Sequence, residues 1–147
     1  MNESGEPQPN TPLRSPEGNE KIDLRILIAD DESGMRGLLE MVLGMKYTSV
    51  ESENDGKSLL SKLSDPTYKV DFIITDNTMP GLTGLEAIRE IRKIDRFKNT
   101  PIILFTSDTG GIKEEAESAD VNAFFLAKPF KNIQELYDVI EKLRQQH

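Results

Sequence analysis

The 147-residue sequence contains no cysteine and no tryptophan. Without cysteine the protein has no disulfide framework and no thiolate metal site, which fits a reducing compartment. No stretch approaches the roughly 18 apolar residues of a membrane span, and the amino-terminal stretch lacks the apolar core of a signal peptide. We therefore expect a cytoplasmic protein without a membrane partner.

Positive charge is also scarce. The chain has 18 lysine and arginine residues against 26 aspartate and glutamate residues, a net charge of -8 and a sequence pI of about 4.7. A protein that binds nucleic acid or anionic lipid through non-specific electrostatics needs a basic stripe, and none is present. We therefore expect neither nucleic acid nor a membrane surface as a partner.

Large apolar residues are nearly absent from residues 1–22. Four of the eight prolines lie in this segment, and Leu13 is its only leucine, isoleucine, valine or aromatic residue before Ile22. Such a composition cannot bury enough surface to offset the entropy lost on ordering. We expect residues 1–22 to form a disordered tail, with a docking role as the alternative, and residues 23–147 to form one folded domain.

From residue 23 onward, short apolar runs alternate with segments of helical periodicity. We expect strands at residues 25–29, 48–52, 70–75, 102–105 and 123–127, each followed by a helix whose apolar residues lie within 35–45, 59–63, 85–94, 112–119 and 133–143. Alternation at this period predicts βαβ units, a parallel sheet and right-handed crossovers. The fold class is therefore α/β, with every strand ending at the same edge.

Local signals mark several element ends. Ser33 is expected to cap the first helix and Asn132 the last, while Asp65-Pro66 should end the second. Gly81 and Gly84 are expected to serve as turn residues after the third strand.

Polar side chains follow four of the five apolar runs. Asp30 and Asp31 come after the first run, Asp76 after the third, Thr106 after the fourth and Lys128 after the fifth. Because the carboxyl ends of parallel strands form the ligand-binding edge of open α/β sheets, we expect these side chains to converge. This convergence is the strongest functional signal that the residues themselves provide.

The residue types at this edge suit phosphoryl transfer. Closely packed carboxylates repel one another, which raises the pKa of at least one unless a cation such as Mg²⁺ offsets the charge. Asp31, Asp76 and the backbone carbonyl of Thr78 could hold Mg²⁺. Asp76 could then attack phosphorus. Lys128 would supply a positive charge to one phosphoryl oxygen, and the Thr106 hydroxyl a hydrogen bond to another.

Each of these residues also has an ordinary explanation when taken alone. Asp76 could be a turn residue, and Asp30-Asp31-Glu32 could be a solvated acidic turn beside a helix amino terminus. Lys128 could be a surface lysine attracted by the acids. Their convergence favours the phosphoryl site, and Glu32 is the acid that we expect to be only solvated.

Residues 23–145 resemble the receiver domain of response regulators in two-component signalling, of the chemotaxis-regulator type. The matching motifs are ILIADDE, TDNTMPGLTGLE, ILFTS and FFLAKPF, in that order. Gaps of 45 residues from Asp31 to Asp76, 30 to Thr106 and 22 to Lys128 agree with the family pattern. The resemblance implies a flavodoxin-like (βα)5 doubly wound sheet, with strand order 2-1-3-4-5 and helices on both faces.

The resemblance also implies a role for each residue of the edge: Asp76 is the phosphoacceptor, Asp30 and Asp31 are the metal-binding pair, Thr106 is the switch hydroxyl and Lys128 senses the phosphate. Phe125 matches the switch aromatic, where tyrosine is common, and the bond from Lys128 to Pro129 is usually cis. Residues 78 and 108 match positions that tune the loss of phosphate.

The function implied is that of a single-domain response regulator. A histidine kinase or a histidine phosphotransfer protein would phosphorylate Asp76 with Mg²⁺ and so remodel the face made by the fourth helix, the fifth strand and the fifth helix. Output would pass to an unknown downstream protein or onward in a phosphorelay, and the domain would not be an enzyme.

Two alternatives remain. A haloacid-dehalogenase-like phosphatase needs a second acid two residues after its nucleophile, where this chain has Thr78, and no cap insertion is visible. A phosphorylation-independent binding module would normally have lost an acid or Lys128, and all are present.

Overall fold

The computed structural model describes residues 20–108 and 110–146. The strands are β1 (Ile22–Ala29), β2 (Tyr47–Glu53), β3 (Phe72–Thr75), β4 (Ile102–Thr106) and β5 (Phe124–Ala127). The helices are α1 (Ser33–Gly44), α2 (Gly56–Ser64), α3 (Gly84–Ile91), α4 (Ile112–Ser118) and α5 (Ile133–Gln145), with a short 3-10 helix, η1 (Asp95–Phe97), before β4. The disorder predicted for residues 1–22 lies mostly outside the described residues, and Ile22 is already part of β1.

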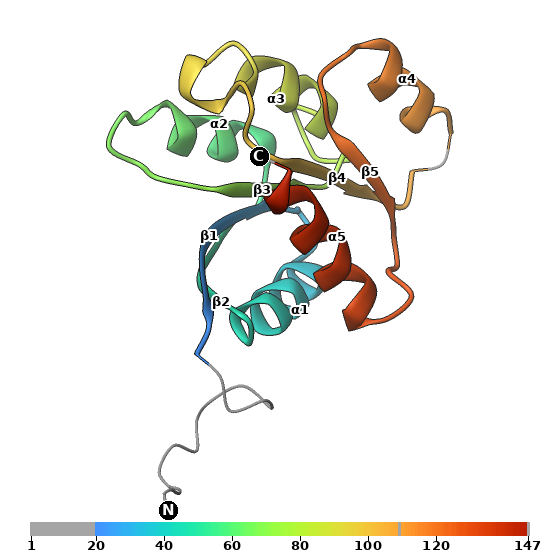
Figure 1. The fold of residues 1–147 in the computed structure, drawn as a ribbon. Coiled ribbons are helices and arrows are strands. Elements are labelled where there is room, and N and C mark those ends of the chain that lie inside the picture. Colours follow the sequence, from blue (N-terminus) through green and yellow to red (C-terminus); the bar gives the residue numbers. More distant parts are fainter. Residues whose placement is uncertain (1–19, 109, 147) are drawn as a thin grey trace, which may run out of the picture.

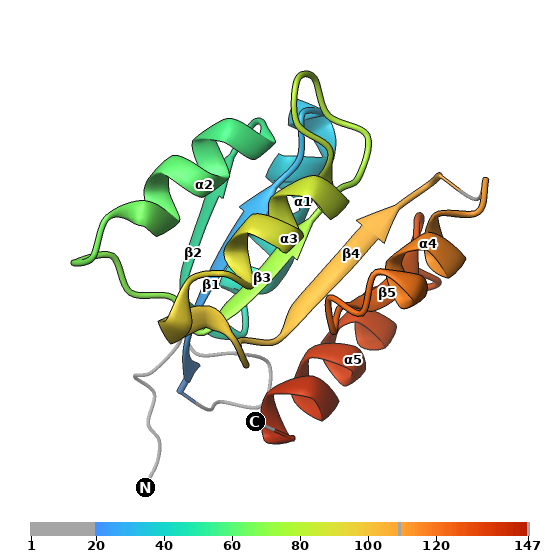
Figure 2. The same cartoon turned by 90° about the horizontal axis from the view of Figure 1, so that it is seen from above.

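All five strands form one parallel sheet in the order β2-β1-β3-β4-β5, which confirms the expected topology (Figure 2). β3 and β4 are buried along their whole length, as expected of central strands covered on both faces. The carboxyl ends of the strands therefore meet at one edge of the sheet, which we call the carboxyl edge. The opposite edge, where the strands begin, is the amino edge.

Helices cover both faces of the sheet, as expected. α2, α3 and α4 lie on one face, and α1 and α5 lie on the other (Figure 1). Each face has its own apolar core. Leu59 of α2 and Ile88 of α3 are fully buried on the first face, and Leu39 of α1 and Leu136 of α5 on the second. The sheet is thus held rigidly between two cores, which fixes the positions of its strand ends.

Several element ends differ from the sequence prediction. Ser33 does not cap α1: it is the first helical residue, Glu32 precedes it, and no side chain caps the helix. The reason is that the helix begins one residue earlier: the Glu32 carbonyl accepts the N–H of Arg36 at 3.0 Å, which puts Glu32 in the cap position. The other two predicted ends are confirmed: Asn132 accepts the N–H of Glu135 at the start of α5, and α2 ends at Ser64 with Asp65 as its C-cap.

The third strand and the third helix are both shorter than predicted. β3 begins at Phe72 rather than at Val70. α3 ends at Ile91, and Ile94 lies in the turn before η1. In the described part of the chain, no helix is long and apolar enough to cross a membrane.

Candidate functional site

The carboxyl edge brings Asp30, Asp31 and Asp76 together. β1 and β3 are neighbours in the sheet, and Ala29 pairs with Thr75, so the residues that follow these two are adjacent. One carboxylate oxygen from each of the three acids lies within 4.8 Å of the others. Asp30 and Asp76 are buried and Asp31 is exposed. The sequence prediction that these acids converge is therefore confirmed.

The two members of the acidic pair are held very differently. Asp30 donates its N–H to Glu53 at 3.1 Å, and its two carboxylate oxygens accept from the Glu32 N–H at 2.9 Å and the Lys128 ammonium at 2.7 Å. The Asp31 carboxylate makes no hydrogen bond to any described residue. Asp30 is consequently a fixed part of the edge, whereas the position of Asp31 depends on its backbone.

Lys128 reaches into this cluster from the end of β5. Its Nζ lies 2.7 Å from Asp30 Oδ2 and 3.3 Å from Asp76 Oδ2, and its side chain is only 9% exposed. Burial by itself would lower the pKa of Lys128, but the hydrogen bond to Asp30 and the negative charges of Asp76 and Asp30 outweigh it and raise the pKa above its usual value. The ammonium therefore stays charged and offsets part of the carboxylate repulsion. The Lys128-Pro129 peptide bond is cis, as expected.

The residues at this edge fit a hard divalent cation. Three carboxylates face a single ammonium, so the cluster keeps an excess of negative charge near a buried surface. One oxygen of each carboxylate lies within 4.8 Å of the others, so Asp30, Asp31 and Asp76 could hold one Mg²⁺ after their side chains move closer together. Asp31 is exposed and free to make that movement. The carbonyl of Thr78, which accepts no hydrogen bond among the described residues, lies on the loop beside Asp76.

Hydrogen bonds and close backbone packing hold Asp76 against β1 and the start of α3. Its N–H donates to the Ala29 carbonyl at 2.8 Å, and its Oδ1 accepts the N–H of Asn77 at 2.7 Å. The Asn77 side chain in turn accepts the N–H of Leu85, in the first turn of α3. A Cβ at Gly84 would lie 2.0 Å from the Asp76 carbonyl oxygen, so only glycine fits there.

These contacts correct one prediction and add a residue. Gly81, with φ of 82°, is a turn glycine as expected. Gly84 is instead the first residue of α3, and its function is to let the helix approach Asp76. The sequence analysis did not predict a role for Asn77. Its buried side chain lies directly after the central acid and connects that acid to α3.

Thr106 and Phe125 lie on the same face of the sheet. Phe125 pairs with Leu104, which belongs to the α4-side core, and Thr106 lies two residues beyond Leu104 on the same strand. Side chains two residues apart on a strand point to the same face. The Thr106 hydroxyl oxygen accepts the N–H of Asp108 at 3.1 Å, so its own hydrogen is available to donate. Phe125 is half-buried and packs against this core.

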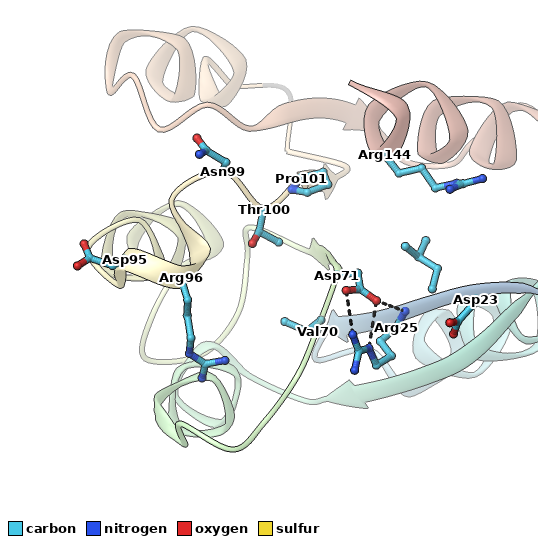
Figure 3. A pocket seen from close by; sticks show the side chains of 11 residues that line it. Asp23, Arg25, Val70, Asp71, Asp95, Arg96, Asn99, Thr100, Pro101 and Arg144 are labelled. Carbon is cyan, nitrogen blue, oxygen red and sulfur yellow. Dashed lines mark hydrogen bonds and ion pairs between the residues drawn. The ribbon is translucent and has the colours of Figure 1, made fainter. Parts of the chain in front are cut away.

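The amino edge, at the other end of the strands from the acidic cluster, carries a hollow of about 590 Å³ (Figure 3). It is lined by residues at the starts of β1, β3 and β4, and by Arg144 of α5. Arg25 and Asp71 form a two-pronged ion pair inside it, with N–O distances of 3.1 and 3.2 Å. None of the residues predicted to form the functional site lies there.

Sequence comparison identifies the family. Residues 26–141 match the family described as the response regulator receiver domain. The chain is 34% identical over 122 residues to the chemotaxis protein CheY of Pseudomonas aeruginosa, which covers 82% of this chain and 95% of that protein. It is 33% identical over 109 residues to CheY1 of Helicobacter pylori, covering 73% and 86% respectively.

Solved structures agree with the sequence comparison. CheY4 of Vibrio cholerae superposes with a TM-score of 0.71 at 31% identity, covering 83% of this chain and 99% of that one. The response regulator TrrA of Thermotoga maritima, solved in complex with Mg(2+)-BeF, superposes with a TM-score of 0.69 at 33% identity, covering 82% and 98%. Receiver domains are signalling domains rather than enzymes, and they generally partner with histidine kinases. The chain therefore belongs to the response regulator receiver domains of two-component signalling.

Proposed function

We propose that this domain accepts a phosphoryl group on Asp76 from the phosphohistidine of a histidine kinase or a histidine phosphotransfer protein. Mg²⁺ would be held by Asp30, Asp31, Asp76 and the Thr78 carbonyl. The observation that carries the proposal is the position of the Lys128 ammonium between two buried carboxylates, with a third carboxylate beside them. Such a group of charges is costly to bury unless a ligand uses it.

The residues of the edge have distinct tasks in this reaction. The Asn77 N–H and Lys128 each hold one oxygen of Asp76, so the carboxylate is oriented before the donor arrives. A carboxylate oxygen attacks phosphorus while the P–N bond breaks and its electrons return to the imidazole of the donor. Bound Mg²⁺ would neutralise charge on the phosphoryl oxygens and on the carboxylates.

Lys128 and Thr106 would then stabilise the acyl phosphate. Lys128 already contacts Asp76, so a small rotation would bring its ammonium to a phosphoryl oxygen. Thr106 has a free hydroxyl hydrogen for another oxygen, and Phe125 lies on the same face beneath α4. Movement of Thr106 toward the phosphate would let the ring follow, which would remodel the surface formed by α4, β5 and α5.

Position 125 holds phenylalanine, so the ring motion would rest on packing alone. The altered surface would bind a downstream protein or support onward transfer in a phosphorelay. Thr78 and Asp108, two residues past Asp76 and Thr106, would tune the lifetime of the phosphoryl group. Action in the cytoplasm remains a prediction.

The test is incubation of the purified chain with acetyl phosphate or phosphoramidate, with and without Mg²⁺, followed by intact mass spectrometry. We expect a gain of about 80 Da that requires Mg²⁺. Asp76→Asn should abolish the gain. Asp71→Asn, which removes a carboxylate at the amino edge, is the matched control and should be phosphorylated as the wild type is. Labelling that persists in Asp76→Asn would move the acceptor elsewhere, with Asp30 and Asp31 tested next.

Absence of any mass gain in a folded protein would favour a phosphorylation-independent binding module or a very short-lived phosphoryl state. Beryllofluoride, which mimics a phosphoryl group on aspartate, separates these two. A Mg²⁺-dependent response to beryllofluoride that is lost in Asp76→Asn would show a competent acceptor with a short lifetime, and no response would contradict the proposal.

A further inference from the structure

Arg36 is the basic residue of α1 that reaches back to the acidic edge. Its Nη1 donates to the backbone carbonyl of Asp30 at 2.9 Å, while its own N–H donates to the Glu32 carbonyl at 3.0 Å in the first turn of the helix. The side chain is half-buried, and among the described residues it forms no ion pair with a carboxylate. Among the described residues, its guanidinium therefore donates to the loop that carries the acidic pair.

The bonded carbonyl belongs to the peptide group that joins Asp30 to Asp31. Asp30 is already fixed through its N–H and both carboxylate oxygens, whereas the Asp31 carboxylate accepts no hydrogen bond from a residue that the structure describes. The direction in which Asp31 projects is set by the plane of the 30–31 peptide. Arg36 is the side chain that holds this plane.

We propose that Arg36 is a positioning residue for the metal site: by fixing the 30–31 peptide, it aims the otherwise unsupported Asp31 carboxylate at Mg²⁺. This inference rests on the proposed function, because it assumes that the acidic cluster binds a divalent cation. Partners that orient metal ligands from outside typically change metal affinity by tenfold or more when they are removed.

The inference predicts the opposite sign from simple electrostatics. Arg36 adds a positive charge near three carboxylates, so its charge alone should oppose Mg²⁺ binding, and neutralising it should tighten the binding. The positioning role predicts that neutralising Arg36 weakens Mg²⁺ binding, because the Asp31 carboxylate is no longer held in the right direction. The direction of the change therefore distinguishes the two effects.

The experiment measures Mg²⁺ affinity by isothermal titration calorimetry at constant ionic strength for the wild type, Arg36→Gln and Arg36→Lys. Glutamine is shorter and uncharged, so it cannot reach the Asp30 carbonyl. We expect Arg36→Gln to bind Mg²⁺ about tenfold more weakly, with a nearly unchanged melting temperature. The matched control is Arg89→Gln, an exposed arginine on α3, which should bind as the wild type does.

A second readout needs no metal. The backbone ¹⁵N shift of Asp31 reports on the hydrogen bond to the preceding carbonyl, so it should move in Arg36→Gln. In every variant, a changed Asp31 ¹⁵N shift should accompany weaker Mg²⁺ binding, and an unchanged shift should accompany wild-type binding. If Arg36→Gln does not fold, the same comparison is made with Arg36→Lys.

The outcomes separate this inference from the proposed function. Tighter or unchanged Mg²⁺ binding in Arg36→Gln, or a moved Asp31 shift with unchanged binding, overturns the positioning role and leaves the acidic site intact. A wild-type chain that binds no Mg²⁺ overturns the metal site of the proposed function and this inference with it.

Discussion

The two edges of the sheet handle charge in opposite ways. At the carboxyl edge, three carboxylates share the single ammonium of Lys128, and two of the three are buried. At the amino edge, the charged side chains that line the hollow each have a protein partner: Arg25 pairs with Asp71 (Figure 3), Arg144 with Glu141 and Asp95 with Lys98, while Asp23 accepts a hydrogen bond from the Thr48 hydroxyl. Both edges hold acids and bases, but the carboxyl edge is where three carboxylates gather around one ammonium.

The same contrast holds for basic side chains that form no ion pair with a described acid. Arg96 donates to the carbonyls of Leu63, Asp65 and Tyr68, so this amino-edge guanidinium is satisfied by the backbone. A residue whose charge is fully satisfied within the chain has little left to offer a ligand. A hollow alone is therefore a weak sign of function in this molecule, whereas the unbalanced charge at the carboxyl edge is a strong one.

The largest effect should come from the backbone contact behind Asp76. Gly84→Ala would place a Cβ 2.0 Å from the Asp76 carbonyl oxygen, so α3 or the loop must move. We expect a loss of about 3 kcal/mol or more in the free energy of unfolding, measured by urea denaturation. This would show that the carboxyl edge depends on close packing for its geometry.

Gly37→Ala is the matched control for that variant. Gly37 is exposed on α1, and nothing lies within 4 Å of the position its Cβ would take. Alanine should stabilise the helix by up to about 1 kcal/mol there. A cost below about 1 kcal/mol for Gly84→Ala would mean that the Asp76 loop yields easily, contrary to a rigid edge.

The next effect tests the amino edge, where Arg92 joins two loops. Its guanidinium donates to the carbonyls of Val121 and Asn122 at 2.7 Å, and to those of Phe97 and Thr100 at 2.8 Å. Burial lowers the pKa of Arg92, and no acid in the described part of the chain forms an ion pair with it. We expect Arg92→Met to cost about 2–3 kcal/mol in the free energy of unfolding, because several carbonyls lose their donor.

Arg92 is the C-cap residue of α3, and Arg89→Met, on the exposed face of that helix, provides the comparison and should change stability little. Mg²⁺ affinity, measured alongside, should be unchanged in Arg92→Met if the two edges are independent. A large loss of Mg²⁺ binding in that variant would instead show that the amino edge supports the carboxyl edge.

Sequence patterns predicted the features that are local. The alternation of apolar runs with helical segments gave the α/β order, and the polar residue after each strand located Asp30, Asp76 and Lys128. Both signals are local because strand ends are marked by the sequence itself, and a parallel sheet brings them to one edge.

The features that escaped prediction depend on tertiary contacts. Gly84 resembles a turn glycine in the sequence, and only the packing of α3 against Asp76 reveals why a side chain cannot fit. Arg36 and Arg92 look like ordinary helical arginines, because the carbonyls they bind come from other segments. Ser33 was a plausible cap, but the first helical hydrogen bond runs from the Arg36 N–H to the Glu32 carbonyl and places Glu32 in the cap position instead.

The smallest effect gives the sharpest contrast, because the same chemical change should have opposite signs at the two edges. Asp31→Asn removes an unpaired carboxylate from an over-acidic cluster and should raise the unfolding midpoint without Mg²⁺ by about 1–3 °C. Asp71→Asn removes the partner of Arg25 and should lower the midpoint by a similar or smaller amount, because that pair is largely exposed. Two shifts of the same sign would break the comparison.

Added Mg²⁺ and changes in pH should affect the stabilities of these two variants differently. Added Mg²⁺ stabilises the wild type by mass action and Asp31→Asn much less, so the stability advantage of that variant should shrink or reverse, while the stability deficit of Asp71→Asn stays constant.

For Asp71, burial would raise the pKa, but hydrogen bonds from the Arg25 side chain and N–H outweigh it and lower the pKa. A lowered folded-state pKa gives stability that is present above the usual aspartate pKa and is lost as the pH falls through the folded value. The deficit of Asp71→Asn should therefore persist from pH 7 to 5 and fade below about pH 4. A deficit that persists at lower pH would show that Asp71 contributes through packing rather than through its charge.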